Sequence, residues 1–439
     1  MLQSGVKYMG MNQTPASERV HISFFGRRNA GKSSVINAVT GQDLAIVSDI
    51  KGTTTDPVYK TMELLPLGPV MVIDTPGIDD EGELGALRVK KSYQVLNKTD
   101  IGVLVVDSTV GTGVPEEALI RKFQDKGIPY VIAYNKCDLI SCEKMALLRE
   151  QEITSANRKG GAGTVSHDIL TQDADSHTIC VSAAKKTNIY ELKEMIASLK
   201  PEDTHKYPLI GDLMSPLDLI ILVVPIDKAA PKGRLILPQQ QTIRDILEHG
   251  GLSMVVRDTE LKDALTNLLS KGIRPHLVVT DSQAFKRVSR DTPADIPLTS
   301  FSILFARYKG DLKTAVEGAA ALRDIQDGDR ILIAEGCTHH RQCDDIGTFK
   351  IPNWIRQYTG KQPEFVFTSG TEFPDDVSAF KLVVHCGGCM LNEREMKYRI
   401  ACCQDQHVPI TNYGILIAQV TGILKRSLEP FPEIYGILP

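Results

Sequence analysis

Cysteine and histidine residues gather in two short stretches in the last third of this 439-residue chain. The first is Cys-Thr-His at residues 337–339, and the second is His-Cys-Gly-Gly-Cys at residues 385–389. Thiolates and imidazoles bind zinc and iron–sulfur clusters, so the two stretches together predict a soft-ligand metal site. The candidate ligands are the thiolates of Cys337, Cys386 and Cys389 and the imidazoles of His339 and His385.

Each of these stretches follows an apolar run that predicts a buried strand, Arg330–Ala334 for the first and Lys381–Val384 for the second. The carboxyl ends of strands in an open parallel sheet converge on one crevice, where ligands usually bind. We therefore expect the two halves of the metal site to meet in space. Cys343, Cys402 and Cys403 are expected to be small core or surface residues instead.

A second set of motifs, near the N-terminus, predicts a nucleotide site. An apolar strand, Val20–Phe25, is followed by Gly-Arg-Arg-Asn-Ala-Gly-Lys-Ser at 26–33 and then by a helical stretch, which is the setting of a phosphate-binding P-loop. Glycines let backbone amides approach phosphates, and a helix N-terminus adds positive potential. Lys32 would neutralise the β- and γ-phosphates, and the Ser33 hydroxyl would ligate Mg²⁺.

Three further motifs follow in the order expected of a GTPase of the translation-factor class. Asp-Thr-Pro-Gly at 74–77 would supply a carboxylate for the magnesium shell and an amide for the γ-phosphate. Asn-Lys-Cys-Asp at 135–138 would select guanine, because an Asp there accepts from the base. Ser-Ala-Ala at 182–184 fits the last base-contacting loop. An unrelated glycine-rich turn would not explain four ordered motifs.

The residues around the first switch resemble those of the tRNA-modification and Era-like GTPases. Gly52–Asp56 resembles their G-T-T-R-D sequence, with Thr55 in place of Arg, which implies that Thr54 senses Mg²⁺. Asn29 matches the asparagine that helps hold K⁺ in potassium-activated members. Ile78 stands where Ras-type proteins carry a water-orienting glutamine, so unaided hydrolysis should be slow and should be stimulated by K⁺.

The predicted catalytic residues are Lys32, Thr54, Asp74 and Gly77, with Ser33, Thr54 and Asp74 at Mg²⁺ and Asn29 at K⁺. The predicted nucleotide-binding residues are Gly26, Asn29, Ala30, Gly31, Lys32, Ser33, Ser34, Asn135, Lys136, Asp138, Ser182, Ala183 and Ala184.

Composition limits the other classes of function. The formal net charge of −4 shows no basic bias toward nucleic acid or anionic membranes. The longest apolar run, Leu217–Ile226, is too short to span a bilayer, and residues 1–19 lack the apolar core of a signal peptide. Nine unevenly spaced cysteines beside a nucleotide motif indicate reduced thiols. We expect a cytoplasmic protein that binds neither nucleic acid nor membranes.

The middle of the chain predicts a small parallel sheet. Residues 201–208 form a plausible linker, and strands then alternate with amphipathic helices up to about residue 291. No nucleophile–base pair is recognisable there. A sheet this small exposes edges that need covering, so self-association is expected.

A Cys-x-His sequence, 45 residues, and then His-Cys-x-x-Cys, all behind this GTPase signature, resemble the HydF family of FeFe-hydrogenase maturation GTPases over essentially the whole chain. The resemblance implies an α/β fold of three domains. These are a P-loop GTPase domain at 1–202, with a mixed, mostly parallel sheet and helices on both faces, an α/β dimerisation domain at 208–291, and an α/β iron–sulfur cluster-binding domain at 292–439.

The resemblance also implies a function, namely a scaffold that carries a di-iron precursor of the hydrogenase H-cluster. Cys337, Cys386 and Cys389 would hold a 4Fe–4S cluster with one exchangeable iron ligand, for which His339 and His385 are candidates. The implied partners are a second copy of the chain, or a higher oligomer, two radical-SAM maturases and apo FeFe-hydrogenase. GTP, GDP, Mg²⁺ and K⁺ complete the expected cofactors, and hydrolysis would bias domain association.

Two other interpretations stay open at this point. The first is a GTPase of tRNA modification or ribosome assembly with a structural zinc site, which would predict a basic face or a known RNA module, and neither is evident. The second is a zinc-delivery GTPase, whose metal would be colourless.

Overall fold

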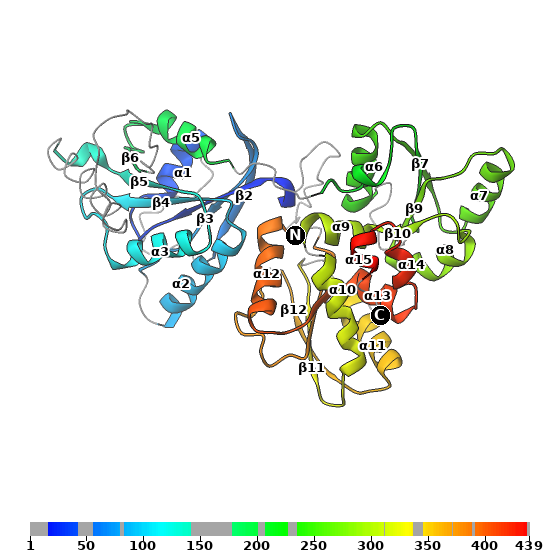
Figure 1. Cartoon of the computed structure of the whole chain (residues 1–439). Coiled ribbons are helices and arrows are strands. Elements are labelled where there is room, and N and C mark those ends of the chain that lie inside the picture. The colour runs from blue at the N-terminus through cyan, green and yellow to red at the C-terminus, as the bar shows by residue number, and fades with distance from the viewer. Residues whose placement is uncertain are drawn as a thin grey trace, which may run out of the picture. The chain divides into compact units, whose positions relative to one another are not determined.

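The computed structural model of the chain describes residues 16–42, 56–79, 83–141, 178–200, 207–226, 235–310, 312–336, 346–370, 372–388 and 391–436. The chain divides into two compact units, residues 1–203 and 204–439 (Figure 1). Within the described ranges, no helix is both long enough and apolar enough to cross a lipid bilayer.

The first unit is built on a six-stranded sheet in the order β2-β3-β1-β4-β5-β6. All neighbouring strands run parallel except β2 and β3, which are antiparallel. The main elements are β1 (Val20–Phe25), α1 (Lys32–Thr40), β2 (Val58–Leu64), β3 (Gly68–Asp74), α2 (Glu83–Val95), β4 (Ile101–Asp107), α3 (Val114–Asp125), β5 (Tyr130–Asn135), β6 (Thr178–Cys180) and α5 (Ile189–Ser198).

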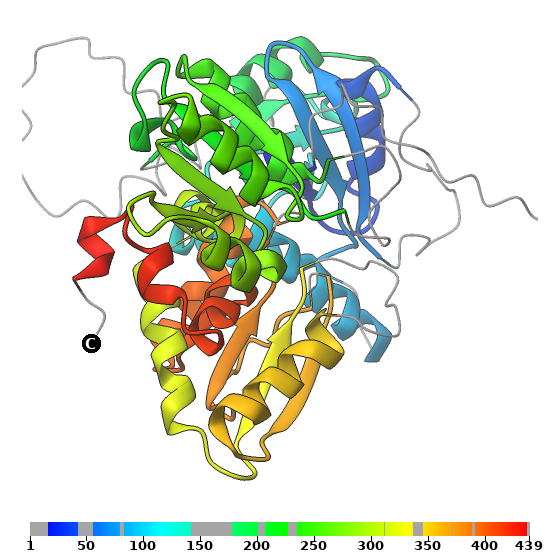
Figure 2. The ribbon, with the colours of Figure 1, turned by 90° about the vertical axis from the view of Figure 1, so that its right-hand side faces the viewer.

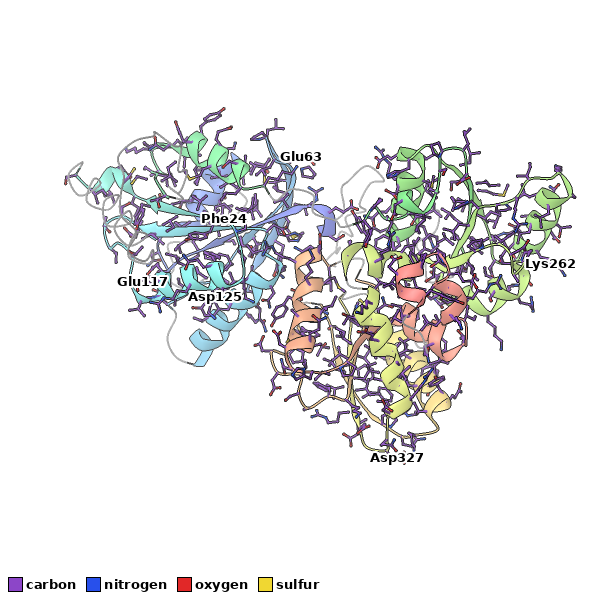
Figure 3. The ribbon with its side chains drawn as sticks, in the orientation of Figure 1. Phe24, Glu63, Glu117, Asp125, Lys262 and Asp327 are labelled. Atoms are coloured by element: carbon purple, nitrogen blue, oxygen red, sulfur yellow. The ribbon has the colours of Figure 1, made fainter. Side chains whose placement is uncertain are left out.

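Helices cover both faces of this sheet, which explains why its central strands are almost continuously apolar. On one face, α1 and α5 pack side chains such as Val35 and Leu192 onto the strands, and on the other face α3 does so with Leu119 and Phe123. Phe24 of β1 is buried in this interior, whereas Glu117 on α3 is exposed (Figure 3). The predicted mixed, mostly parallel sheet with helices on both faces is confirmed.

The second unit contains two parallel four-stranded sheets, in the orders β10-β9-β7-β8 and β12-β11-β13-β14. The strands of the first sheet and the helices that connect them are β7 (Leu219–Val223), α6 (Leu237–Glu248), β8 (Leu252–Val256), α7 (Leu261–Ser270), β9 (Leu277–Thr280), α8 (Phe285–Asp291) and β10 (Leu298–Ser300). Those that follow are α9 (Phe301–Lys309), α10 (Leu312–Ala320), β11 (Arg330–Ala334), α11 (Ile351–Thr359), β12 (Glu364–Thr368), β13 (Leu382–His385), α12 (Glu393–Asp405), β14 (Ile410–Asn412), α13 (Tyr413–Val420), α14 (Leu424–Ser427) and α15 (Pro432–Tyr435).

Apolar side chains pack against both faces of the last sheet. Successive side chains of β11 point to opposite faces, so they take part in two separate clusters. Ile331 and Ile333 pack with Ile355 of α11, while Leu332 and Ala334 pack in a separate cluster that includes α12. Figure 2 shows α11 lying along this sheet.

One apolar cluster joins the two sheets of the second unit. It contains Leu222 from β7, Phe285 from α8, Leu304 from α9, Val316 from α10 and Ile415 from α13. The second unit is therefore compact although it holds two sheets. Strand β10 pairs with β9, so residues 298–300 belong to the first of these sheets, and the domain boundary predicted at residue 292 stays a prediction.

Candidate functional site

The predicted P-loop forms a tight turn between β1 and α1. Gly26 has a φ of 147°, and a Cβ atom built on it would lie 2.2 Å from the carbonyl oxygen of Val105. Only glycine fits such a close approach of two backbones. The Lys32 ammonium donates hydrogen bonds to the carbonyl oxygens of Gly26 and Arg27, both at 2.9 Å, so it lies across this loop.

Ser33 and Asp74 meet at the start of α1, as expected of a magnesium site. The Ser33 hydroxyl donates to Asp74 Oδ2 at 2.8 Å. Asp74 is buried, and its other carboxylate oxygen, Oδ1, has no hydrogen-bond partner among the described residues. Burial raises the pKa of Asp74, although the Ser33 hydrogen bond and the Lys32 charge act in the opposite direction. A hydroxyl and a buried carboxylate oxygen that lacks a donor are the hard oxygen ligands that Mg²⁺ prefers, so these residues fit the ion.

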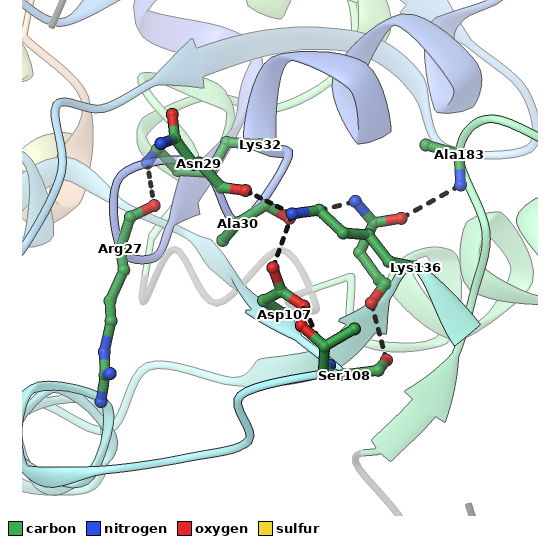
Figure 4. A network of polar contacts seen from close by, with 10 residues as sticks. Arg27, Asn29, Ala30, Lys32, Asp107, Ser108, Lys136 and Ala183 are labelled. Atoms are coloured by element: carbon green, nitrogen blue, oxygen red, sulfur yellow. Dashed lines mark hydrogen bonds and ion pairs between the residues drawn. The ribbon is translucent and has the colours of Figure 1, made fainter. Parts of the chain in front are cut away.

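Asn135 joins the phosphate loop to the last guanine-recognition motif. Its side-chain amide donates to the Ala30 carbonyl at 3.0 Å, and its side-chain oxygen accepts from the Ala183 amide at 3.1 Å (Figure 4). The Ser108 hydroxyl donates to the backbone carbonyl of the same asparagine at 2.6 Å. Three motifs that are far apart in the sequence are thus held together by one side chain.

Lys136 adds a second link across the same site. Its ammonium donates to the Asn29 carbonyl at 2.8 Å and to Asp107 Oδ2 at 2.5 Å (Figure 4). Burial acts to raise the pKa of Asp107, but the hydrogen bonds from Lys136 and Thr109 outweigh it and lower that pKa. Asp107 was not among the predicted residues, although a carboxylate at the end of a buried strand is the same signal that identified Asp74.

The remaining predicted residues of this site divide into three groups. Gly31, Ser34, Gly77, Asp138, Ser182 and Ala184 lie in the loops and helix starts that border the network. Ile78, at the position of a water-orienting glutamine, is buried in the core beside α2 and α3. Thr54 lies outside the described residues. Sequence reasoning also missed Arg27, which forms an ion pair at 2.6 Å with the buried Glu116 of α3.

Two members of the predicted metal site, His385 and Cys386, lie at the carboxyl end of β13, which is a neighbour of β11 in the last sheet. Ala334 pairs with His385, and the Cys386 amide donates to the Ala334 carbonyl at 3.1 Å. The Gly336 amide then donates to the Cys386 sulfur at 3.0 Å. Gly336 directly precedes Cys337 in the sequence. The ends of the two predicted strands therefore do converge.

His385 is buried at the end of β13. Its Nδ1 lies 2.5 Å from the Cys386 carbonyl oxygen, and a carbonyl can only accept, so Nδ1 carries the proton. Burial lowers the pKa of His385 to about 4, and the nearby Arg399 charge acts in the same direction. The imidazole is neutral near pH 7, and Nε2 keeps the lone pair that a metal ligand needs.

Helix α12, which follows the metal loop in the sequence, contains a buried ion pair. Asn392 caps the helix by accepting from the Glu395 amide at 3.1 Å. Arg399 is fully buried, donates to Glu395 at 3.1 Å and to the Gly370 carbonyl at 2.8 Å, and lies 5.1 Å from the centre of the Phe373 ring. A buried arginine bound on several sides is costly to displace, so it fixes α12 against the sheet.

Two other cysteines of this region, Cys402 and Cys403, behave as core residues, while Cys343 lies outside the described residues. Cys402 and Cys403 are buried in the apolar cluster beneath the sheet, as expected from the sequence. Burial raises the pKa of Cys403 to about 12, so it stays a thiol. Cys386, by contrast, is partly exposed.

Three of the predicted metal ligands, Cys337, His339 and Cys389, lie outside the described residues. Within the described part of the chain, no group of three or more Cys, His, Asp or Glu side chains is arranged around a common point. The described members of the predicted set are Cys386 and His385, at the junction with Gly336.

Family models match three consecutive parts of the chain. Residues 21–136 match a model described as a 50S ribosome-binding GTPase. Residues 209–310 match the hydrogen maturase F dimerization domain, and residues 313–430 match the hydrogen maturase F tetramerization domain.

Individual relatives match less than half of the chain. The chain is 34% identical over 154 residues to GTPase Der of Maridesulfovibrio salexigens, covering 34% of this chain and 33% of the relative. It is 28% identical over 227 residues to the tRNA modification GTPase MnmE of Paraburkholderia xenovorans, covering 45% of this chain and 48% of that protein. The chain thus spans between a third and a half of these relatives. The crystal structure of Era from Aquifex aeolicus, at 18% identity and a TM-score of 0.35, covers 61% of this chain and 97% of that one, and it adds nothing to what the sheet order shows.

Proposed function

Because this chain belongs to the hydrogen maturase F family, we propose that it is a GTP-hydrolysing carrier that binds a 4Fe–4S cluster and delivers a di-iron precursor to apo FeFe-hydrogenase. The observation that carries the proposal is the hydrogen bond from Gly336 to the Cys386 sulfur. It brings the residue before Cys337 within reach of a cysteine 50 positions away. Three domains are proposed, at 1–202, 208–300 and 301–439, with the second extended to include β10.

The proposed GTPase reaction gives GDP and phosphate. Ser33 and Asp74 would hold Mg²⁺, which would neutralise the negative charge that develops during phosphoryl transfer. When the nucleotide binds, the Lys32 ammonium would donate its hydrogen bonds to phosphate oxygens in place of the two loop carbonyl oxygens. Ile78 is an aliphatic residue buried in the core, so it cannot orient the attacking water. We therefore assign the stimulation of GTP hydrolysis to K⁺ near Asn29 and to Thr54 on the first switch.

At the metal loop, Cys337, Cys386 and Cys389 would ligate the cluster, with His339 and His385 as candidates for the exchangeable position. A cluster of this kind supplies one iron that can accept a ligand of the incoming di-iron precursor. The chain itself contributes an amide donor to one sulfur, which disperses negative charge on it, and a neutral imidazole whose Nε2 can bind iron.

Self-association is the part of the proposal that rests on the middle sheet. Strand β8 forms one edge of this sheet, and Leu252 and Val255 are 50% and 44% exposed on it. An exposed apolar edge strand is a template for pairing with another chain. We propose that the β8 edge contacts a second copy of the chain in a cytoplasmic dimer or higher oligomer. This oligomer would also bind the radical-SAM maturases.

The test is anaerobic reconstitution with iron and sulfide, followed by visible absorption and EPR of the reduced protein. The wild type should turn brown and give a cluster signal. Cys337→Ala, Cys386→Ala and Cys389→Ala should each lose most of it, whereas Cys402→Ala, a cysteine buried in the core beneath, should keep it. Undiminished cluster content in all three variants would refute the assignment. A colourless wild type that retains zinc would favour the zinc-site interpretation instead.

The tRNA-modification alternative is less well supported. The match to the tRNA modification GTPase MnmE of Paraburkholderia xenovorans covers 45% of the chain, whereas the models over 209–310 and 313–430 belong to hydrogen maturase F.

A further inference from the structure

Two residues of the nucleotide site adopt an unfavourable backbone conformation. Lys136, in the guanine-recognition motif, and Asn29, in the P-loop, both have a φ of 65°, in the left-handed region that residues other than glycine rarely adopt. Such strain costs free energy and persists only where surrounding contacts hold it in place. The two strained residues are joined directly, because the Lys136 ammonium donates to the Asn29 carbonyl at 2.8 Å. The contacts that fix this ammonium therefore help to keep both loops in their observed conformation.

Asp107, at the end of β4, is the charged partner of Lys136. Its Oδ2 accepts from the Lys136 ammonium at 2.5 Å (Figure 4), and its Oδ1 accepts from the Thr109 amide at 2.9 Å and from the Thr109 hydroxyl at 2.6 Å. Burial acts to raise the pKa of Asp107, but these hydrogen bonds lower it, so the group is ionised near pH 7. Because both carboxylate oxygens are bonded, the direction in which Oδ2 faces is set before a nucleotide binds.

The backbone beside Asp107 aligns the two partners of this ion pair. Asp107 pairs with Asn135 in the register of β4 and β5, and the Ser108 amide and hydroxyl both donate to the Asn135 carbonyl, at 2.9 Å and 2.6 Å. The side chains of Asp107 and Lys136 are only 18% and 32% exposed. A charge-assisted hydrogen bond between groups that are aligned and partly shielded from water is stronger than a solvated surface pair.

We propose that Asp107 is a positioning residue for guanine nucleotides and that it acts through Lys136. By holding the lysine ammonium, it keeps Lys136 against the Asn29 carbonyl, and so it keeps the guanine-recognition motif in the position relative to the P-loop that a bound nucleotide requires. This contact is the same for bound GTP and for the transition state, so its loss should weaken binding without slowing the hydrolysis of bound GTP. The proposal concerns the GTPase unit alone and is independent of the metal loop.

The test uses the full-length chain without its cluster and a fluorescent GDP derivative, whose affinity is measured by titration. Asp107→Asn should weaken binding roughly tenfold, because a charge-assisted hydrogen bond is lost. Its kcat at saturating GTP should stay within about twofold of the wild type. Asp125→Asn, the same change at an exposed position at the end of α3 (Figure 3), should leave affinity and kcat unchanged. An unchanged affinity of Asp107→Asn, or a kcat that falls as much as the affinity, would overturn the proposal.

A double-mutant cycle separates action through Lys136 from a general effect on the fold. In Lys136→Met the carboxylate has no ammonium to hold, so adding Asp107→Asn should change the affinity by less than about twofold. A second loss as large as the first in that background would also overturn the proposal.

A second variant covers the case in which Asp107→Asn does not fold. Thr109→Val keeps the carboxylate but removes a donor that orients it, and it should weaken binding roughly threefold. If circular dichroism shows that Asp107→Asn melts below the assay temperature, Thr109→Val is the deciding variant, and wild-type affinity in it refutes the role of Asp107.

Discussion

The buried His385 predicts a specific loss of stability in acid. Its pKa is about 4 in the folded chain, below the ordinary value of 6.5, because burial penalises the imidazolium. Between these two values the unfolded chain binds a proton that the folded chain does not. Stability from this residue is therefore complete above pH 6.5 and falls as the pH drops toward 4. A difference of about 2.5 pH units corresponds to about 3 kcal/mol.

The perturbation is His385→Asn, whose side-chain amide can replace the Nδ1 donor to the Cys386 carbonyl but cannot titrate. Urea unfolding of the cluster-free chain would be measured at several pH values between about 7 and 4. The chain has a single tryptophan, Trp354 on α11, so its fluorescence follows the second unit. Carboxylates that titrate in the same range affect wild type and variant alike, and they cancel in the comparison.

We expect the stability advantage of the wild type over His385→Asn to shrink by about 3 kcal/mol between pH 7 and pH 4. His407→Asn, at an exposed position where the backbone is left-handed and asparagine is well tolerated, is the control and should follow the wild type. A difference between wild type and His385→Asn that stays constant with pH would refute the neutral, buried imidazole.

Three further predictions concern the other sites. Asp74→Asn removes the carboxylate charge at the magnesium site, so GTP turnover measured by phosphate release should fall roughly a hundredfold, and near-normal turnover would contradict that role. Turnover of the wild type should be faster in K⁺ than in Na⁺, and Asn29→Ala should remove the difference, while equal wild-type rates in the two salts would eliminate the potassium site. Leu252→Lys with Val255→Lys should weaken self-association by about 3 kcal/mol or more in analytical ultracentrifugation, and an unchanged dissociation constant would mean that β8 is not the contact.

The alternating strands and helices of the last sheet could be predicted from the sequence because their patterns are strong. The strand expected at Arg330–Ala334 has these bounds in the structure, and the one expected at Lys381–Val384 is observed as Leu382–His385. The observed strand is shifted by one residue, and it includes His385 because this residue pairs with both Ala334 and Asn412. Convergence of the two strand ends followed from parallel pairing alone.

Helix α9 shows why the remainder could not be predicted. Six of its nine residues are buried, including Arg307 and Lys309, so it lacks the polar stripe by which an amphipathic helix is recognised. Strand β10 was missed for a different reason, since three residues are too few to establish a period of two.

The apolar cluster that joins the two sheets of the second unit has a mechanical consequence. The exposed edge of β8 and the loop at Cys386 belong to one packed body, and interiors packed this closely transmit displacement instead of absorbing it. In a symmetric pair of chains joined through β8, the two Cys386 loops would therefore be held at one fixed distance from each other.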